Sequence, residues 1–172
     1  MKPLELHDLR YLAAAQGWLE LGNHLEADEE LENITAEQRA HPAVLEMRWQ
    51  IYAKAGKWEG ALDIASALVQ LVPESALGWV HRSYAFHELK RTAEARDNLL
   101  RVEDRFPEDP TMRYNLACYE CQLGRLEQAK NWLGKAFEVG DSKKIKLMAL
   151  EDPDLEPLWR ETGEIGPSNP SV

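Results

Sequence analysis

Cys118 and Cys121 are the only cysteines of this 172-residue chain, and both lie in the segment ACYECQLG at 117–124. A Cys-x-x-Cys pair supplies half of the ligands of a structural zinc site, or it forms the reactive dithiol of a redox protein. A zinc site needs a second pair of ligands, and the chain has no other cysteine pair and no paired histidines at a fixed spacing. A redox dithiol needs its reactive cysteine at a helix N-terminus, where the helix dipole lowers the thiol pKa. The secondary structure around the pair therefore decides which chemistry is open to it.

Other signatures of catalysis are missing from the sequence. The chain has no glycine-rich phosphate-binding loop, no Gly-x-Ser-x-Gly motif and no His-Glu-x-x-His motif. Its histidines are scattered, and His7, His24 and His41 fall at expected helix ends or linkers, where a surface role is usual. We therefore expect a protein that is not an enzyme, with no catalytic residues.

Composition and charge exclude two classes of partner. Hydrophobic residues make up 44% of the chain and charged residues 29%, as in soluble globular proteins. The formal net charge of −10 predicts no nucleic-acid partner, because the phosphates would be repelled. No apolar run approaches the roughly 18 residues of a membrane span, and acidic residues interrupt the start of the chain where a signal peptide is apolar. The lack of such a run predicts no membrane partner. Two cysteines without a secretory signal predict reduced thiols and a cytoplasmic location.

The sequence repeats with a period of 34 residues. Four segments align without gaps, at 21–31, 55–65, 89–99 and 123–133, and alanine recurs five residues after the second position of each. Glycine occupies that second position in three segments, and it ends a helix easily because it adopts positive φ without strain. Each unit is therefore expected to hold two helices of about 13 residues on either side of this position. Lys90 occupies the glycine position of the third segment and must end its helix without that freedom.

The period, the paired helices and the recurring alanine resemble the tetratricopeptide repeat. The fourth unit, RYNLACYECQLGRLEQAKNWLGKAFE, is the best match, and the whole resembles small stand-alone bacterial proteins of this family. The resemblance implies an all-α fold, a right-handed α-solenoid of four helix-turn-helix repeats with a C-terminal capping helix. It predicts a repeat array over 1–150, with units at 8–41, 42–75, 76–109 and 110–143 and the capping helix at 142–150. Ser142 is expected to cap that helix.

Residues 151–172 are then a C-terminal capping segment followed by a frayed tail. Leu155, Leu158 and Trp159 are expected to cover the flank of the fourth unit. The sequence also departs from the family at Trp49, where a small residue is usual, and at Arg48 and Arg82, where a long apolar residue is usual. We expect the first helices of the second and third units to pack in an altered way at these positions.

The repeat register places Cys118 and Cys121 in the middle of the first helix of the fourth unit, three residues apart on one face. Thiols at this position lack the help of a helix N-terminus. The register also sets His87 beside Cys121, so a weak three-ligand site remains as a metal or redox hypothesis. Because free cysteines usually behave as small hydrophobic residues, we predict no metal and no cofactor.

In the tetratricopeptide family the first helices line a concave side that faces the ligand. The resemblance therefore implies a protein-binding face that consists of Leu12, Gln16, Glu46, Gln50, Val80, Tyr84, His87, Tyr114, Cys118 and Cys121. Tyr84 and Tyr114 are its large amphipathic anchors. Of the residues with which chaperone-binding members grip a C-terminal carboxylate only Asn115 is present, so heat-shock chaperone tails are not expected as ligands.

We predict a non-enzymatic protein–protein interaction module that binds a peptide or helix of a partner on this concave face. The acidic balance of the chain favours a ligand with basic flanks, mainly through the association rate. Alternatively, the apolar residues of the face are covered by the curvature of a tight superhelix or by the C-terminal segment. A structural homo-oligomer and a metal- or redox-responsive protein using Cys118, Cys121 and His87 are the other two function classes.

Overall fold

The structure, a computed structural model, describes residues 3–162 and divides the chain into two compact units, 1–85 and 86–172. We call them the N-terminal unit and the C-terminal unit. Residues 3–162 form α-helices, short 3-10 turns and loops, without a β-strand, as the repeat predicts. None of the helices in this part of the chain is both long and apolar enough to cross a membrane. The predicted frayed tail lies outside the described residues.

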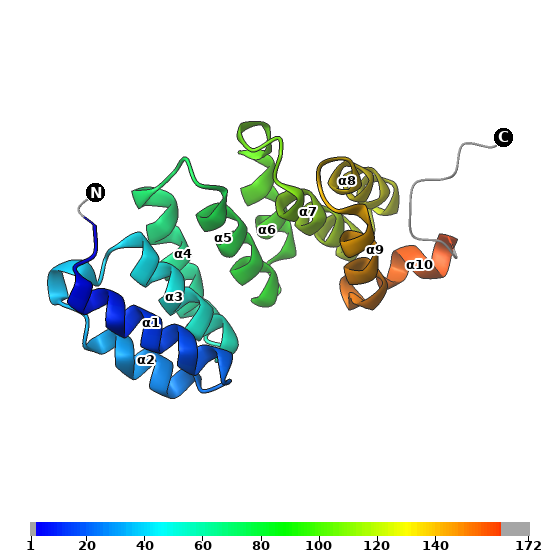
Figure 1. The fold of residues 1–172 in the computed structure, drawn as a ribbon. Coiled ribbons are helices and arrows are strands. Elements are labelled where there is room, and N and C mark those ends of the chain that lie inside the picture. Colours follow the sequence, from blue (N-terminus) through cyan, green and yellow to red (C-terminus); the bar gives the residue numbers. More distant parts are fainter. Residues whose placement is uncertain (1–2, 163–172) are drawn as a thin grey trace. The chain divides into compact units, whose positions relative to one another are not determined.

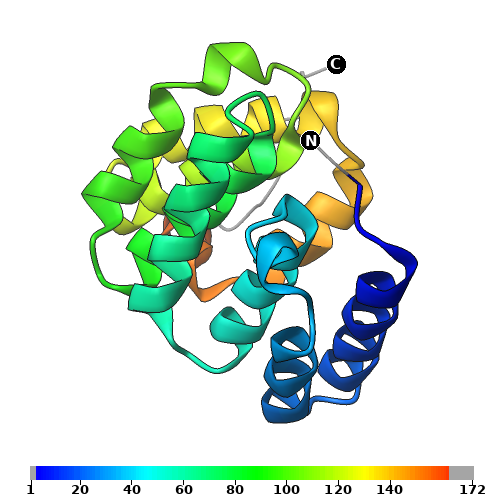
Figure 2. The ribbon, with the colours of Figure 1, turned by 90° about the vertical axis from the view of Figure 1, so that its left-hand side faces the viewer.

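The N-terminal unit contains two helix pairs and the start of a fifth helix. The first pair is α1 (Leu6–Glu20) and α2 (His24–Glu32), which lie antiparallel and side by side (Figures 1 and 2). A 3-10 turn at Ala36–Gln38 leads to the second pair, α3 (Pro42–Lys54) and α4 (Trp58–Leu71). Helix α5 (Ala76–Glu88) belongs to this unit as far as Ala85.

The C-terminal unit begins at Phe86, in the last turn of α5, and its elements follow one another along the chain (Figure 1). They are α6 (Thr92–Leu100), a 3-10 turn (Glu103–Arg105), α7 (Pro110–Gln122), α8 (Leu126–Val139), α9 (Ser142–Glu151), a 3-10 turn (Pro153–Leu155) and α10 (Glu156–Thr162). Helix α9 lies where the sequence predicts a capping helix at 142–150. Its N-cap is Asp141 rather than Ser142, because the Asp141 carboxylate accepts hydrogen bonds from the backbone N–H groups of Lys143 and Lys144.

The recurring positions of the repeat have the environments that their residue types predict. The four recurring alanines have no exposed surface, and their small side chains let the paired helices approach closely. They are Ala27, Ala61, Ala95 and Ala129. The turn positions all have positive φ: 81° at Gly22, 67° at Gly56, 62° at Lys90 and 74° at Gly124. Lys90 therefore adopts the left-handed conformation that costs a non-glycine residue about 1–2 kcal/mol.

The unusual residues of the sequence are accommodated by stacking and ion pairing. Trp49 is buried and stacks on His81, with 3.6 Å between ring centroids and 6° between ring planes. Arg48 pairs with Glu32 at 2.9 Å, and the Arg82 guanidinium lies 4.6 Å from the centre of the Trp79 ring. These contacts give Trp49, Arg48 and Arg82 partners at positions where the family usually has small or apolar residues.

Candidate protein-binding faces

Two pockets open in the N-terminal unit, and residues of α3, α4 and α5 line both of them. The first, which we call the Glu46 pocket, has a volume of about 200 Å³ and is lined by Pro42, Ala43, Glu46, Leu68, Val72, Ser75, Leu77 and Gly78. The second, the Tyr84 pocket, is a shallow depression of about 480 Å³ lined by Leu19, Trp49, Gln50, Ala53, Lys54, Trp58 and Tyr84. Together they make up what we call the N-terminal face. Three of the predicted face residues, Glu46, Gln50 and Tyr84, line these pockets.

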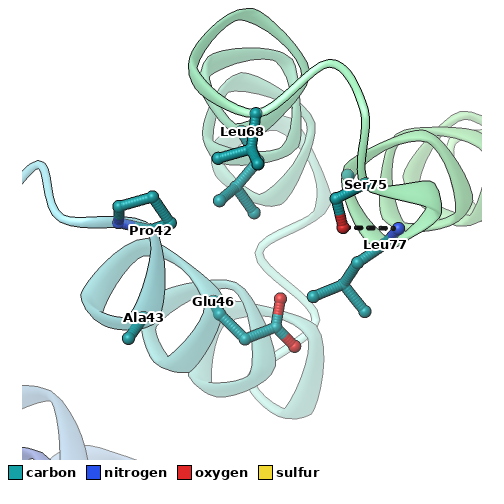
Figure 3. Close-up of a pocket in the computed structure, with 8 residues that line it drawn as sticks. Pro42, Ala43, Glu46, Leu68, Ser75 and Leu77 are labelled. Carbon is teal, nitrogen blue, oxygen red and sulfur yellow. Dashed lines mark hydrogen bonds between the residues drawn. The ribbon is translucent and has the colours of Figure 1, made fainter. Parts of the chain in front are cut away.

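The Glu46 pocket is apolar apart from one carboxylate and one hydroxyl. Figure 3 shows the Glu46 side chain reaching toward the space that Leu68, Ser75 and Leu77 border. Gly78 brings α5 close to the end of α4, since an added Cβ would lie 3.1 Å from the Val69 backbone nitrogen. A larger residue at this position would push the two helices apart and open the pocket.

Glu46 is held by two partners. Its carboxylate oxygens lie 2.9 Å from His81 Nε2, and Gln50 Nε2 donates to Oε1 at 3.0 Å. Burial acts to raise the pKa of Glu46, but the hydrogen bonds and charge supplied by His81, together with Gln50, outweigh it and lower that pKa. Glu46 therefore presents a fixed negative charge at neutral pH at the edge of an apolar pocket.

Aromatic rings dominate the Tyr84 pocket. Tyr84 packs edge-on against Trp58 at 5.6 Å and against Trp49 at 6.3 Å between ring centroids. Tyr84 is 40% exposed, whereas Trp49 is 8% exposed. Such a cluster holds the exposed ring in place while leaving one of its sides accessible, as binding anchors require.

The remaining predicted residues of the N-terminal unit line neither pocket. Leu12 packs against the core formed by α1, α2 and α3. Gln16 donates a hydrogen bond to Glu20 at 2.8 Å, and Val80 is half-buried on α5. The predicted face is thus concentrated on α3 and α5 in this unit.

In the C-terminal unit the predicted face is covered by residues 152–158, which we call the C-terminal segment. Tyr114, Cys118 and Cys121 are 6%, 5% and 2% exposed, and His87 is 9% exposed. The Tyr114 hydroxyl donates to Asp152 Oδ2 at 2.7 Å, and the Cys118 thiol lies 3.6 Å from the same oxygen. The alternative that the sequence left open, a face covered by the C-terminal segment, is realised here.

The other carboxylate of the segment is held from a different helix. His87 Nε2 lies 2.8 Å from Asp154 Oδ2, and His87 Nδ1 lies 3.0 Å from Thr92 Oγ1. Gln122 Nε2 donates to the Asp154 backbone carbonyl at 2.9 Å. Five side chains of α5, α6 and α7, those of His87, Thr92, Tyr114, Cys118 and Gln122, thus either hold the segment or orient the residue that holds it.

Both thiols of the Cys-x-x-Cys pair are suppressed as nucleophiles. Burial raises the pKa of Cys118 well above its usual value, and the Asp152 and Asp154 carboxylates raise it further. Burial also raises the pKa of Cys121, although a hydrogen bond from the Leu158 backbone opposes the rise. Burial raises the pKa of Tyr114 too, as does its position beside Cys118 and Asp152. Tyr114 and Cys118 stay protonated and act as hydrogen-bond donors to Asp152, whereas Cys121 accepts its hydrogen bond.

The geometry gives the metal or redox hypothesis no support. Both ring nitrogens of His87 already have partners, and within residues 3–162 no three His, Cys, Asp or Glu side chains are placed to hold a metal ion. Sequence reasoning also missed the partners of this face: Thr92, Gln122, Asp152 and Asp154. The repeated aspartates beside Pro153 were the available signal, but the register of a repeat does not show where residues beyond the array fold back.

No protein-family model and no curated protein matches the chain. Solved structures do resemble it. TTC0263, a thermophilic TPR protein of Thermus thermophilus, aligns with a TM-score of 0.75 and 20% identity over 91% of this chain and 83% of that one. MamA 41-end from Desulfovibrio magneticus RS-1 aligns with a TM-score of 0.68 and 17% identity over 94% and 100%. A chain of the APC/C hetero-tetramer Cut9–Hcn1 aligns at 0.70 and 18%, over 91% of this chain but 30% of that one. At these identities the likeness is one of fold.

Proposed function

Because the chain has the tetratricopeptide repeat fold, an all-α fold of the α-solenoid class, we propose that it is a non-enzymatic protein–protein interaction module. The ligand is a peptide or helix of a partner protein, and it binds on the N-terminal face. The structural likeness to a chain of the Cut9–Hcn1 hetero-tetramer supports this function class. The chemistry of the exposed side chains supports the choice of face.

The observation that carries the proposal is the exposed ring of Tyr84. It stands 40% exposed above a shallow pocket whose walls include Trp49 and Trp58. Aromatic residues of this kind bury large areas when a partner covers them, and they dominate the energy of many interfaces. An apolar side chain of the ligand is expected to sit beside Tyr84, and Gln50 at the pocket wall is placed to hydrogen-bond a peptide backbone.

The charge of the N-terminal unit favours a ligand with basic flanks. Residues 1–85 contain seven Lys or Arg and thirteen Asp or Glu, a net charge of −6. Glu46 adds a fixed carboxylate at the edge of the neighbouring pocket. A negative field of this kind speeds the approach of a basic peptide and contributes less to its final affinity.

Selection from a random peptide library on the full chain tests the proposal. We expect selected peptides to carry an aromatic or aliphatic anchor flanked by Lys or Arg. The Tyr84→Ala variant should bind them about thirtyfold more weakly, which is about 2 kcal/mol. Leu25→Ala is the matched control, because Leu25 is 63% exposed on α2 and lines neither pocket. Equal binding to wild type and Tyr84→Ala would remove the N-terminal face from the proposal.

A homo-oligomer is the second candidate, and one surface favours it. Helix α9 exposes Leu147, Met148 and Leu150, with relative exposures of 64%, 45% and 49%, beside the exposed lysines Lys143, Lys144 and Lys146. The acidic helix α2 of a second copy offers the complementary charge. Sedimentation velocity should then show association that weakens in the Lys144→Glu, Lys146→Glu variant. A monomer at every concentration would exclude this candidate.

A further inference from the structure

We propose that the face of α7 and His87 is a second binding site, specific for acidic peptides of the Asp-x-Asp-Leu type, and that the chain's own C-terminal segment occupies it as an internal ligand. The site lies within the C-terminal unit and stands independently of the N-terminal face. Its occupant in the free chain is Asp-Pro-Asp-Leu at 152–155.

The segment makes the polar contacts of a bound peptide. Its two carboxylates are received by side chains of two different helices, Asp152 by Tyr114 of α7 and Asp154 by His87 of α5. Gln122 adds a hydrogen bond to the segment's backbone. Hydrogen bonds to ionised carboxylates are stronger than those between neutral groups, so these contacts select for acidic residues at both positions.

The receiving residues hold particular places in the repeat. Tyr114, Cys118 and His87 occupy positions that the family resemblance assigns to ligand contact. Tyr114 and Cys118 turn their O–H and S–H groups toward one carboxylate oxygen, at 2.7 Å and 3.6 Å. Because none of these positions holds Lys or Arg, the site recognises carboxylates by the geometry of its donors rather than by a permanent positive charge.

Apolar anchors complete the ligand. Leu155 has no exposed surface and Leu158 is 3% exposed, so both leucines of the segment are buried in the C-terminal unit. Pro153 begins a 3-10 turn, and Asp152 Oδ1 accepts a hydrogen bond from the Asp154 backbone N–H at 2.9 Å. This turn fixes the spacing between the carboxylates and the first leucine, which lowers the ordering cost of binding.

Tethering explains why the site is closed in the free chain. A segment joined to its site by a short connection acts at an effective concentration in the millimolar range, so a separate peptide competes poorly with it. A partner that carries the same acidic and leucine pattern gains access when the internal ligand is weakened or when the partner offers more than one contact.

The experiment uses the full chain and a fluorescent peptide of residues 150–160. The Asp152→Asn, Asp154→Asn variant of the chain should bind this peptide at least about tenfold more tightly than wild type, because its internal ligand is weakened. Adding Tyr114→Phe to that variant should reduce binding about tenfold, because the donor to the first carboxylate is lost. A peptide with both aspartates replaced by asparagine is the matched control. If the variant keeps its helical circular dichroism but binds the aspartate and asparagine peptides alike, or neither, the segment is a structural cap only.

A second measurement covers the case in which the variant fails to fold. A protease-cleavable linker is inserted between Glu151 and Asp152 of the wild-type chain, so that the segment remains bound without a covalent tether after cleavage. The proposal requires the fluorescent peptide to replace the cleaved segment while helicity is retained. It is overturned if helicity is lost in step with release of the segment, or if excess peptide fails to replace it.

Discussion

Tyr84 and Tyr114 lie on the side of their helices, α5 and α7, that the family resemblance assigns to ligand contact, but their surroundings differ. Tyr84 is 40% exposed beside two tryptophans, whereas Tyr114 is 6% exposed and donates its hydroxyl hydrogen to Asp152. The first lines an open pocket of the N-terminal unit, and the second is covered by the C-terminal segment. The same side of the repeat is therefore open at Tyr84 in one unit and covered at Tyr114 in the other.

The chemistry of the two faces differs as well. The N-terminal face carries the acceptor Glu46, whose pKa is lowered by His81 and Gln50 against the effect of burial. On the C-terminal face Tyr114 and Cys118 act as donors to Asp152, and burial raises the pKa values of both and keeps them protonated. An acceptor face suits basic ligands and a donor face suits acidic ones. Our two proposals therefore assign ligands of opposite charge to the two units.

The largest expected effect is a difference in unfolding free energy between variants in which a leucine of one face or the other is truncated. Leu155→Ala removes a fully buried anchor and should lower the free energy of unfolding of the C-terminal unit by about 2–5 kcal/mol. Leu77→Ala truncates a residue that is 44% exposed in the Glu46 pocket and should cost less than about 0.5 kcal/mol. Urea denaturation followed by circular dichroism measures both. Similar losses would mean that Leu155 contributes no more than a surface residue does.

The next effect is a crossed loss of binding. Tyr84→Ala should weaken a basic-flanked peptide by about 2 kcal/mol and leave exchange of the acidic peptide unchanged. Tyr114→Phe, made in the Asp152→Asn, Asp154→Asn chain, should do the reverse, because it removes one donor from the C-terminal face and lies outside the pockets of the N-terminal face. Fluorescence anisotropy with the two peptides gives all four values. A variant that weakens both peptides equally would show that the two faces are not separate sites.

The change in unfolding free energy at alkaline pH distinguishes the C-terminal face from the N-terminal face. The pKa of Cys118 is raised in the folded chain above its ordinary value of 9.0, so the thiol's contribution is fully present below about pH 9 and is lost as the pH rises beyond it. The expected loss is about 1.4 kcal/mol per pH unit for each such group. The acceptor Glu46 behaves oppositely, since its lowered pKa gives a contribution that is lost as the pH falls below its ordinary value of 4.5.

Cys118→Ala tests this assignment. The fall in unfolding free energy between about pH 8 and about pH 10, measured with a reductant present, should shrink by about 1 kcal/mol in the variant. Glu46→Gln is the matched control, because Glu46 is already ionised throughout this range. A pH dependence that Cys118→Ala leaves unchanged would show that the thiol is not held protonated by its surroundings.

The sequence predicts the repeat well because period and turn chemistry are local properties. The positive φ values at Gly22 and Lys90 and the complete burial of Ala61 follow from their places in the 34-residue unit. The sequence predicts the closed face poorly, because the Asp152–Tyr114 contact joins residues 38 positions apart. Nothing in the helical periodicity sets the direction in which a chain continues after its last repeat. Whether the ten predicted face residues bind a ligand stays a prediction.

Ion pairing in the fourth repeat was missed for a related reason. Trp18, Tyr52 and Phe86 recur at a spacing of 34, and the corresponding residue of α7 is Glu120. Its carboxylate is 2% exposed and lies 2.6 Å from Arg96 Nε and 3.4 Å from Arg125 Nη1. A carboxylate that is buried at a position where the other repeats hold an aromatic residue is stable only when such cationic partners surround it. Arg96 and Arg125 come from other elements of the C-terminal unit, so the helical pattern of α7 does not reveal them.

The smallest expected effect concerns the turn that follows His87. Lys90 adopts a φ of 62°, and its backbone N–H donates to the His87 carbonyl at 2.8 Å. Lys90→Gly removes a left-handed strain of about 1–2 kcal/mol but gives the unfolded chain more freedom, so the net stabilisation should be about 0.5–1 kcal/mol. Lys90→Ala is the control, because it keeps the strain and should give no such gain. Thermal melts should show this difference, while exchange of the acidic peptide should be the same in all three chains. If Lys90→Gly instead altered that exchange, the closure of the C-terminal face would depend on the turn that positions His87, and not only on the contacts that the segment itself makes.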